Sequence, residues 1–385
     1  MAAVTTVRPL PATHARWWAR PFAIFGADLP PNLLLMAKLI VLALLSQTQL
    51  PLSNHFLPFF PFLDRMGSPA VFHGTLVLVF VTATTALFLN WRVRAASNVL
   101  GLTIFISILA SRPTFSNNLA YCGALLFLIG LQAPDQEPWT LRLQVVLLYF
   151  GAGLNKLLDP DWRSGQFFEY WFGHVHSHAW YLQLAGHMPP LLLSKLMSWG
   201  SFCTELGLFV MLLFRRLFPL AILVGLTFHT SMLVLTNSTF RMYYIAACLS
   251  YLAFVTWPRE LLTVAYDHES SLCAKAMKFF RRIDLERRCD WIASPGLREG
   301  MCLVLGQKRY HGFAALRMLL VYNPLTYFCL VVALRSPDVL HLRRYVALMA
   351  LLSLSPLADQ FGGTVFRLLL HQGYRLRTLT SPRSV

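Results

Sequence analysis

The chain has 385 residues, of which 56% are hydrophobic and only 13% are charged, and its mean hydropathy is +0.54. Soluble domains carry about 25% charged residues, so this composition excludes a water-soluble core for most of the chain. The net charge of +16 matters through its position, because basic residues in the loops orient a membrane protein. The sequence therefore predicts an integral membrane protein.

The hydrophobic residues gather into stretches of about 17 to 25 residues, the length at which an α-helix crosses a bilayer. Residues 1–31 are predicted to be a cytoplasmic N-terminal segment that is not a cleaved signal peptide, because its arginines precede a long apolar stretch without a cleavage site. Residues 32–258 are predicted to form a transmembrane domain of about eight helices: Asn32–Leu50, Ala70–Asn90, Ala96–Ser111, Phe115–Leu131, Leu141–Leu157, Pro190–Phe214, Phe218–Leu235 and Arg241–Trp257.

The basic residues between these stretches predict the orientation. An excess of arginine marks cytoplasmic loops, and most of the arginines that flank the predicted helices fall on one side. An even number of spans then places both termini in the cytoplasm. The loop from Asp159 to Pro189 lies outside, and its many aromatic and histidine side chains indicate that it folds back at the membrane interface.

Three ionisable side chains within or at the ends of predicted spans are candidates for a functional site, because charge there is costly and usually faces a cavity or a partner. Lys156 ends the fifth span, and Glu205 and His229 lie in the middle of the sixth and seventh. The three could converge on one pocket, in which His229 would transfer protons. In the alternative interpretations Lys156 extends to the interface, and His229 pairs with Glu205 or with a nearby threonine.

The sequence around Lys156 carries a family resemblance. The pattern Ala-Gly-Leu-Asn-Lys-Leu at residues 152–157, followed by Asp161-Trp162-Arg163-Ser164-Gly165, resembles the membrane domain shared by vitamin K-dependent γ-carboxylase and its bacterial relatives, the horizontally transferred transmembrane (HTTM) domain. Arg112-Pro113, Asn117-Asn118 and Phe228-His229 extend the resemblance, which covers roughly residues 20–258.

The resemblance implies that Lys156 and His229 are catalytic, with Lys156 as the base that deprotonates a reduced vitamin K-type quinone. Reaction of that quinone with oxygen would then give a strong base, without a metal. Glu205 is expected in the pocket, and Asp161, Trp162 and Arg163 are expected to shape its mouth. The expected partners are the lipid bilayer, a quinone and a protein substrate or partner, in a bacterial inner membrane.

Whether the chain is an enzyme stays open in the sequence. Nothing after Trp257 resembles the large lumenal portion with which the carboxylase grips its substrate, so glutamate carboxylation is not expected. Lipase maturation factors share a similar pattern of glycine, lysine and tryptophan. The alternative function is therefore a non-catalytic membrane scaffold or maturation factor.

Residues 259–385 are predicted to form a separate cytoplasmic domain. From Glu260 onward this region carries 17 basic and nine acidic residues. A strand at 262–267, a turn and a helix from about 274 to 283 are typical of the opening of a small α/β thioredoxin-like domain. Together with 310–317 and 366–375, this opening resembles the DCC family of thiol-disulfide oxidoreductases, which are named for a Tyr-Asp-Gly-x-Cys-x-x-Cys motif.

The redox motif is degenerate in this chain. His268 stands where the family has glycine, and Ser270 replaces the first cysteine, so that only Cys273 is left. A two-cysteine cycle cannot run with a serine in the nucleophile's place. Cys289 or Cys302 could pair with Cys273 only if their Cα atoms came within about 7 Å. The interpretation is a domain retained for docking or stability, with a thiol carrier as the alternative.

Other patterns give weaker predictions. Apolar runs at 324–334 and 345–357 are shorter than about 17 residues, which favours buried or interfacial helices over two further spans. The alternating His174, His176 and His178 could bind a metal only on an extended segment, and interfacial preference explains them as well. No phosphate loop or zinc-finger spacing is present, and nucleic acid is not a predicted partner.

Overall fold

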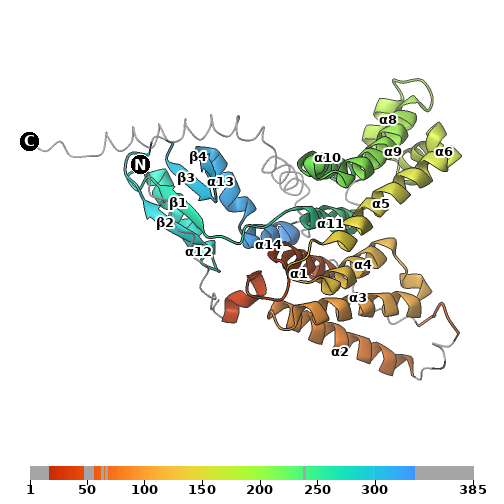
Figure 1. The fold of residues 1–385 in the computed structure, drawn as a ribbon. Helices are drawn as coiled ribbons and strands as arrows, with labels where there is room; N and C mark the ends of the chain where they lie inside the picture. Colours follow the sequence, from red (N-terminus) through yellow and green to blue (C-terminus); the bar gives the residue numbers. More distant parts are fainter. Residues whose placement is uncertain are drawn as a thin grey trace, which may run out of the picture. The chain divides into compact units, whose positions relative to one another are not determined.

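The computed structural model describes residues 17–46, 56–61, 65, 68–236, 240–297 and 299–333. Its elements fall into two compact units (Figure 1). The first unit combines Met1–Glu137 with Arg241–Val385, and the second is Pro138–Phe240. The first unit holds apolar helices and a small sheet, whereas the described part of the second unit is helical.

Five of the described helices are long and apolar enough to cross a membrane. These are α2 (Pro69–Phe88), α3 (Val93–Ala110), α5 (Trp139–Leu158), α9 (Leu192–Leu213) and the stretch Arg215–Leu235, which contains η5 (Arg215–Leu217) and α10 (Phe218–Leu235). The pair α13 (Gly312–Val321) and α14 (Pro324–Ala333) would add a sixth if it is one span, bent by 73°. The chain is therefore an integral membrane protein.

The prediction of eight spans is not confirmed. Two of the predicted spans correspond to shorter apolar helices, α1 (Pro31–Ser46) and α4 (Asn117–Leu131). A third corresponds to α11 (Arg241–Ser250), which ends in the 3₁₀ turn η6 (Tyr251–Phe254). A helix of 16 residues reaches only about 24 Å, against roughly 30 Å of hydrocarbon. Residues 47–50 of the first predicted span, the run at 345–357 and the segment at 366–375 lie outside the described residues.

Helix α1 is buried on all sides, with 14 of its 16 residues inside the first unit. The Nζ atom of the buried Lys38 lies 2.7–3.2 Å from three carbonyl oxygens in and just after η1 (Trp17–Phe22), those of Arg20, Pro21 and Ala23. A buried ammonium is tolerated only when its donors are satisfied. Lys38 thus fixes the N-terminal turn against α1.

Helices α3 and α4 pack with their backbones close together. A Cβ atom built on Gly101 would lie 2.7 Å from the carbonyl oxygen of Gly123, and one built on Gly130 would lie 2.5 Å from the carbonyl oxygen of Arg94. The Ser97 hydroxyl donates to the carbonyl of Leu126 at 2.7 Å. Small residues with a polar cross-link are a common way to join membrane helices.

The C-terminal part of the first unit contains a four-stranded mixed sheet. Its strands are β1 (Leu262–Tyr266), β2 (Cys289–Ala293), β3 (Met301–Leu305) and β4 (Lys308–His311), in the order β2-β1-β3-β4. Strands β1 and β2 are parallel and are joined by α12 (Ser271–Ile283), and the other two pairings are antiparallel. The predicted strand and helix are both confirmed, and α12 begins three residues earlier than expected.

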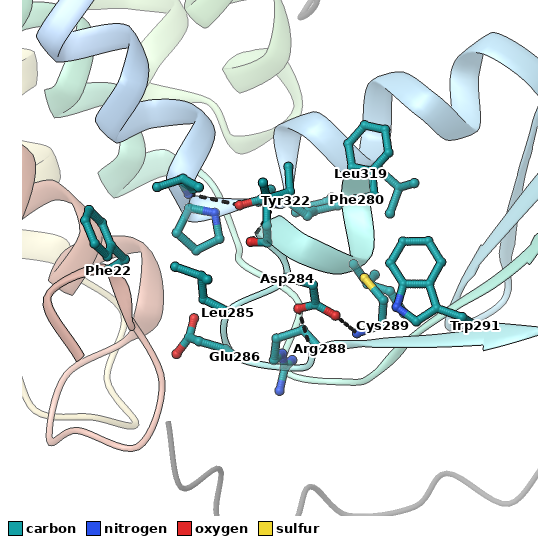
Figure 2. Close-up of a pocket in the computed structure, with 15 residues that line it drawn as sticks. Phe22, Phe280, Asp284, Leu285, Glu286, Arg288, Cys289, Trp291, Leu319 and Tyr322 are labelled. Atoms are coloured by element: carbon teal, nitrogen blue, oxygen red, sulfur yellow. Dashed lines mark hydrogen bonds between the residues drawn. The ribbon is translucent and has the colours of Figure 1, made fainter. Parts of the chain in front are cut away.

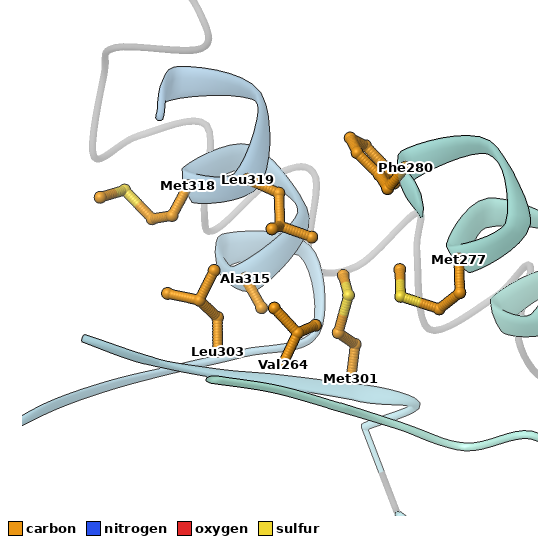
Figure 3. Packing of buried hydrophobic residues seen from close by; sticks show 8 residues of the cluster. All are labelled: Val264, Met277, Phe280, Met301, Leu303, Ala315, Met318 and Leu319. Carbon is orange, nitrogen blue, oxygen red and sulfur yellow. The ribbon is translucent and has the colours of Figure 1, made fainter. Parts of the chain in front are cut away.

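One face of this sheet carries the hydrophobic core of the domain (Figure 3). Val264, Met301 and Leu303 project from the strands toward Ala315 of α13 and Met277 of α12. Because side chains alternate along a strand, the intervening residues lie on the opposite face. Helices α12 and α13 therefore cover the same side of the sheet.

A buried acidic side chain ties the sheet domain to the N-terminal turn. The backbone N–H groups of Ile24 and Phe25 donate to Glu286 Oε1 at 2.9 and 3.0 Å. The Arg288 guanidinium lies 3.8 Å from the centroid of the Phe25 ring and donates to the carbonyl of Glu260 at 2.8 Å. Figure 2 shows Glu286 and Arg288 beside a small cavity that Phe22 also lines. Burial raises the pKa of Glu286.

Replacing Lys38 by methionine tests the structural role of this lysine. The side chain keeps its length but loses the ammonium that donates to the carbonyls of Arg20, Pro21 and Ala23, and we expect a destabilisation of about 1–3 kcal/mol. Thermal unfolding in detergent, followed by tryptophan fluorescence, measures it. Lys195→Met, at an exposed position of α9, is the matched control. Equal melting temperatures for the two variants would contradict the role.

Candidate functional site

The candidate site lies in the second unit, around the end of α5. Tyr149, Gly153 and Lys156 follow one another at spacings of four and three residues, so they share one face of the helix. A Cβ atom on Gly153 would lie 2.9 Å from Leu206 Cγ of α9. Glycine at this position therefore lets α5 and α9 approach closely beside Lys156.

Lys156 and Glu205 form an ion pair between α5 and α9. The ammonium donates to Glu205 Oε1, and the glutamate side chain is only 4% exposed, against 19% for the lysine. Lys156 Nζ also lies 5.0 Å from the centroid of the Trp162 ring. The ammonium of Lys156 is thus paired within the protein. This favours the predicted pocket over the alternative, in which Lys156 extends to the membrane interface.

His229 makes a second connection to α5. Its ring is buried on α10, and Nε2 lies 2.7 Å from the hydroxyl oxygen of Tyr149. The alternative pairing of His229 with Glu205 is not favoured, because the Glu205 Oε1 atom accepts from Lys156 and Oε2 has no hydrogen-bond partner among the described residues. The face of α5 that carries Lys156 therefore contacts both Glu205 and His229.

Only one of the three predicted mouth residues reaches Lys156. Trp162 lies on α6 (Pro160–Ser164) and stacks on Phe167, with ring centroids 4.2 Å apart. Asp161 and Arg163 are exposed. The carbonyl of Arg163 accepts a hydrogen bond from Trp199 Nε1 at 3.2 Å, but its guanidinium does not join the site. On a single turn of helix, neighbouring residues point in different directions.

The predicted interfacial loop forms four short helical segments: α6, α7 (Gln166–Phe168), the π-helical turn η4 (Glu169–Val175) and α8 (Ala179–Ala185). Phe168, Phe172 and Tyr181 form their buried core. Gly165 has φ +89°, and a Cβ atom there would lie 2.6 Å from the backbone nitrogen of Lys195, so this turn requires glycine. The segment packs closely on the start of α9.

The three histidines of this segment do not share a site. His176 and His178 lie against Trp171, with ring centroids 4.3 and 5.9 Å apart. His174 lies 6.1 Å from the ring of Tyr170. In the part of the chain that the structure describes, no group of three histidine, cysteine or acidic side chains is placed to hold a metal ion.

Sequence reasoning missed a polar line along α9. Ser194, Ser198, Ser201 and Glu205 are buried and recur at intervals of three and four residues, which places them on one face. The hydroxyls of Ser198 and Ser201 have, like Glu205 Oε2, no hydrogen-bond partner among the described residues. The signal was present as polar residues at helical spacing in an apolar stretch. Tyr149 was missed as well, because its partner His229 lies 80 residues away.

Cys273, the thiol of the motif predicted to be degenerate, is a buried side chain. Cys273 is buried in the first turn of α12, and the Ser270 side chain caps that helix by accepting from the Cys273 N–H at 3.5 Å. Burial raises the pKa of Cys273. Cys289 pairs with Leu262 at the far end of β1, and Cys302 lies on the sheet face opposite α12. All seven cysteines are free.

We expect Cys273 to react slowly with thiol reagents. A buried thiol with a raised pKa holds little thiolate, the reactive form, at neutral pH. Alkylation by iodoacetamide at pH 7.5, followed by peptide mass spectrometry, should label Cys273 far more slowly in the folded protein than after unfolding in dodecyl sulfate. In the Ser270→Cys variant, the new thiol is as buried as Cys273, but it faces the N–H of Cys273, which favours a thiolate, and it should react faster than Cys273. Equal rates for Cys273 before and after unfolding would argue for an accessible redox thiol.

The comparisons with known proteins agree with the resemblance around Lys156. Residues 131–257, about a third of the chain, match the family model described as HTTM domain. The match includes Lys156, Glu205 and His229, and it begins later than the resemblance read from the sequence, which starts near residue 20. Neither a curated protein nor a solved structure matches the chain. The chain is thus an integral membrane protein that is similar, over residues 131–257, to the HTTM domain.

Proposed function

We propose that the second unit forms the reaction centre of a membrane enzyme related to the γ-carboxylase family, and that it acts on a reduced quinone. The observation that carries the proposal is the ion pair of Lys156 and Glu205, which leaves one buried carboxylate oxygen without a hydrogen-bond partner. An unsatisfied buried acceptor is costly, and such groups occur where a ligand or a reaction uses them.

The residues present fit a quinol of the vitamin K type. Glu205 Oε2 can accept a phenolic hydroxyl, and the Ser198 and Ser201 hydroxyls on the same face can donate to or accept from a ring oxygen. The stacked rings of Trp162 and Phe167 offer an aromatic surface beside Lys156. A bound quinol would supply two electrons and a weakly acidic hydroxyl proton.

The chemistry of this chain's own residues is proton uptake by the ion pair. Lys156 and Glu205 together hold one mobile proton, which lies on Nζ in the ion pair. A proton taken up at Glu205 Oε2 neutralises the carboxylate and leaves the ammonium of Lys156 to stabilise a negative charge nearby. If the proton of Nζ moves to Glu205, Lys156 becomes the base. In both arrangements the pair gains one proton, so the two residues act together.

His229 and Tyr149 are proposed to position this pair and to pass the proton on. Their hydrogen bond joins two buried groups that can each donate or accept, on the same face of α5 as Lys156. The aromatic segment at 160–185 packs on the start of α9. Exclusion of water strengthens every electrostatic interaction within the site and protects reactive species.

The alternative proposal is a non-catalytic scaffold or maturation factor. The same contacts favour it, because the Lys156–Glu205 and Tyr149–His229 pairs join α5 to α9 and to α10 and can serve to hold the bundle together. The strand-helix-strand unit β1-α12-β2, with Ser270 capping its helix, supports a thioredoxin-like domain without redox activity. Such a domain would act through docking.

Lys156→Met separates the two proposals. We expect wild-type protein in nanodiscs to bind reduced menaquinone saturably and to oxidise it with oxygen consumption, and the variant to lose oxidation by at least about 100-fold, the usual loss on removing an acid-base group. Glu205→Gln should lose a similar amount, because the pair acts together. Lys195→Met on α9 is the control for charge removal.

Melting temperatures measured in the same samples complete the test. Loss of oxidation in a Lys156→Met variant that melts like the wild type supports the reaction centre. Absence of quinol binding by well-folded wild-type protein, together with a lowered melting temperature for Lys156→Met, would support the scaffold instead.

A further inference from the structure

Helix α12 of the sheet domain presents a purely basic outer face. Its sequence contains four cationic residues and no acidic one, and the four side chains are exposed: Lys275, Lys278, Arg281 and Arg282. The opposite face carries Met277 and Phe280, which are buried in the domain core. The helix is thus strongly amphipathic, and most of its charged side faces away from the domain core.

Three of these cations line a groove with a volume of about 450 Å³. Lys278, Arg281 and Arg282 form it together with Tyr266 and His268. Arg281 is fixed in place, since its Nη2 donates to the Tyr266 hydroxyl at 3.2 Å and its guanidinium lies 5.4 Å from that ring and 5.8 Å from the ring of Trp291. The groove therefore combines one cation held by side chains of the sheet with two exposed cations.

Most acidic groups of the neighbouring elements are directed elsewhere. None of the described carboxylates lies within 4.0 Å of the cations of α12. Asp284 accepts from the N–H groups of Arg288 and Cys289 at 2.8 and 3.0 Å, and Glu286 binds the N-terminal turn. Asp290 alternates with Trp291 and so lies on the other sheet face. Asp267 and Glu269 flank His268 of the groove: Asp267 is buried and accepts from the N–H of Glu269 at 2.9 Å, whereas Glu269 is exposed. The three cations of the groove therefore outnumber the exposed carboxylate beside it and give the groove a net positive charge.

The short connection between the sheet domain and the apolar helices determines which anions lie close to the groove. Only seven residues, 255–261, separate the end of η6 from the start of β1, a distance of at most about 29 Å for a fully extended chain. Within that connection, the carbonyls of Pro258 and Glu260 accept from Arg288 at 3.2 and 2.8 Å. The domain is thus fastened close to the membrane part of its own unit, where phosphate headgroups are the abundant anions.

A hydrophobic side chain next to the cations fits the same surface. Phe279 follows Lys278 on α12 and is 55% exposed. Cationic residues beside an exposed aromatic ring are typical of helices that lie at a bilayer surface, where the ring enters the headgroup region and the charges contact phosphates. A soluble phosphate compound would leave Phe279 without a role.

We propose that the α12 groove binds the phosphate headgroup of an anionic phospholipid. Lys278 and Arg282 contact the phosphate oxygens, Arg281 supplies a fixed donor, and Phe279 enters the interface. The lipid then attaches the sheet domain to the bilayer at a second point, besides the covalent connection at residues 255–261. This surface is independent of the Lys156 site and of its chemistry.

The test uses the full-length protein, delipidated in a zwitterionic detergent. Binding of dioctanoyl phosphatidylglycerol is compared with that of dioctanoyl phosphatidylcholine by microscale thermophoresis. Lys278→Gln/Arg282→Gln removes two groove cations, and Lys308→Gln/Arg309→Gln removes two exposed cations of β4 in the same domain. A third variant, Lys278→Arg/Arg282→Lys, keeps the charge and reports on folding.

We expect the groove variant to bind phosphatidylglycerol at least about tenfold more weakly, the loss that removal of two membrane-facing cations should cause. The β4 variant and the charge-keeping variant should bind like the wild type, and salt should weaken the binding. Equal affinities for both glutamine variants would overturn the proposal. So would competition by glycerol phosphate or inorganic phosphate at concentrations similar to those of the lipid, because the ligand would then be a free phosphate.

Discussion

A charged side chain among apolar helices needs a partner of opposite charge or a hydrogen-bond acceptor within the protein. This constraint determines which segments pack together inside each unit. Lys156 and Lys38 are each placed on an apolar helix, and each determines which segment packs beside it. Lys156 joins α5 to α9 through Glu205. Lys38 draws the carbonyls of the N-terminal turn onto α1, and Glu286 binds the N–H groups of the next residues. Polar pairs thus fix contacts that apolar surfaces alone would leave free to slide.

The two lysines differ in whether their partners keep unused hydrogen-bonding capacity. The carbonyls around Lys38 accept its donors and do not titrate, so the arrangement is closed and structural. Glu205 uses one oxygen for Lys156 and keeps the other, buried and without a hydrogen-bond partner among the described residues, on the face that also carries Ser198 and Ser201. A carboxylate with an oxygen that accepts no hydrogen bond can take up a proton. The Lys156–Glu205 pair is therefore the candidate site, and the contacts of Lys38 are not.

In the sheet domain, a serine caps the helix that follows the first strand. A cysteine at the start of a helix is activated by the free N–H groups there. In this chain Ser270 occupies the first position and accepts from the Cys273 N–H, so the helix is capped by a hydroxyl and not by a thiol. What the domain retains is a packed core, a buried acidic contact to the N-terminal turn, and the basic outer face of α12.

The sequence by itself determined the membrane class, the three ionisable residues of the site, and the strand and helix around Ser270, because hydropathy and capping are local properties. It did not determine the number of spans, since an apolar stretch such as 241–257 can end its helix early. Only the tertiary structure decided which side chains contact one another. Tyr149 rather than Glu205 meets His229, and Trp162 alone of the mouth residues reaches Lys156. Such choices depend on how each helix is rotated against its neighbours, and packing across distant segments sets that rotation.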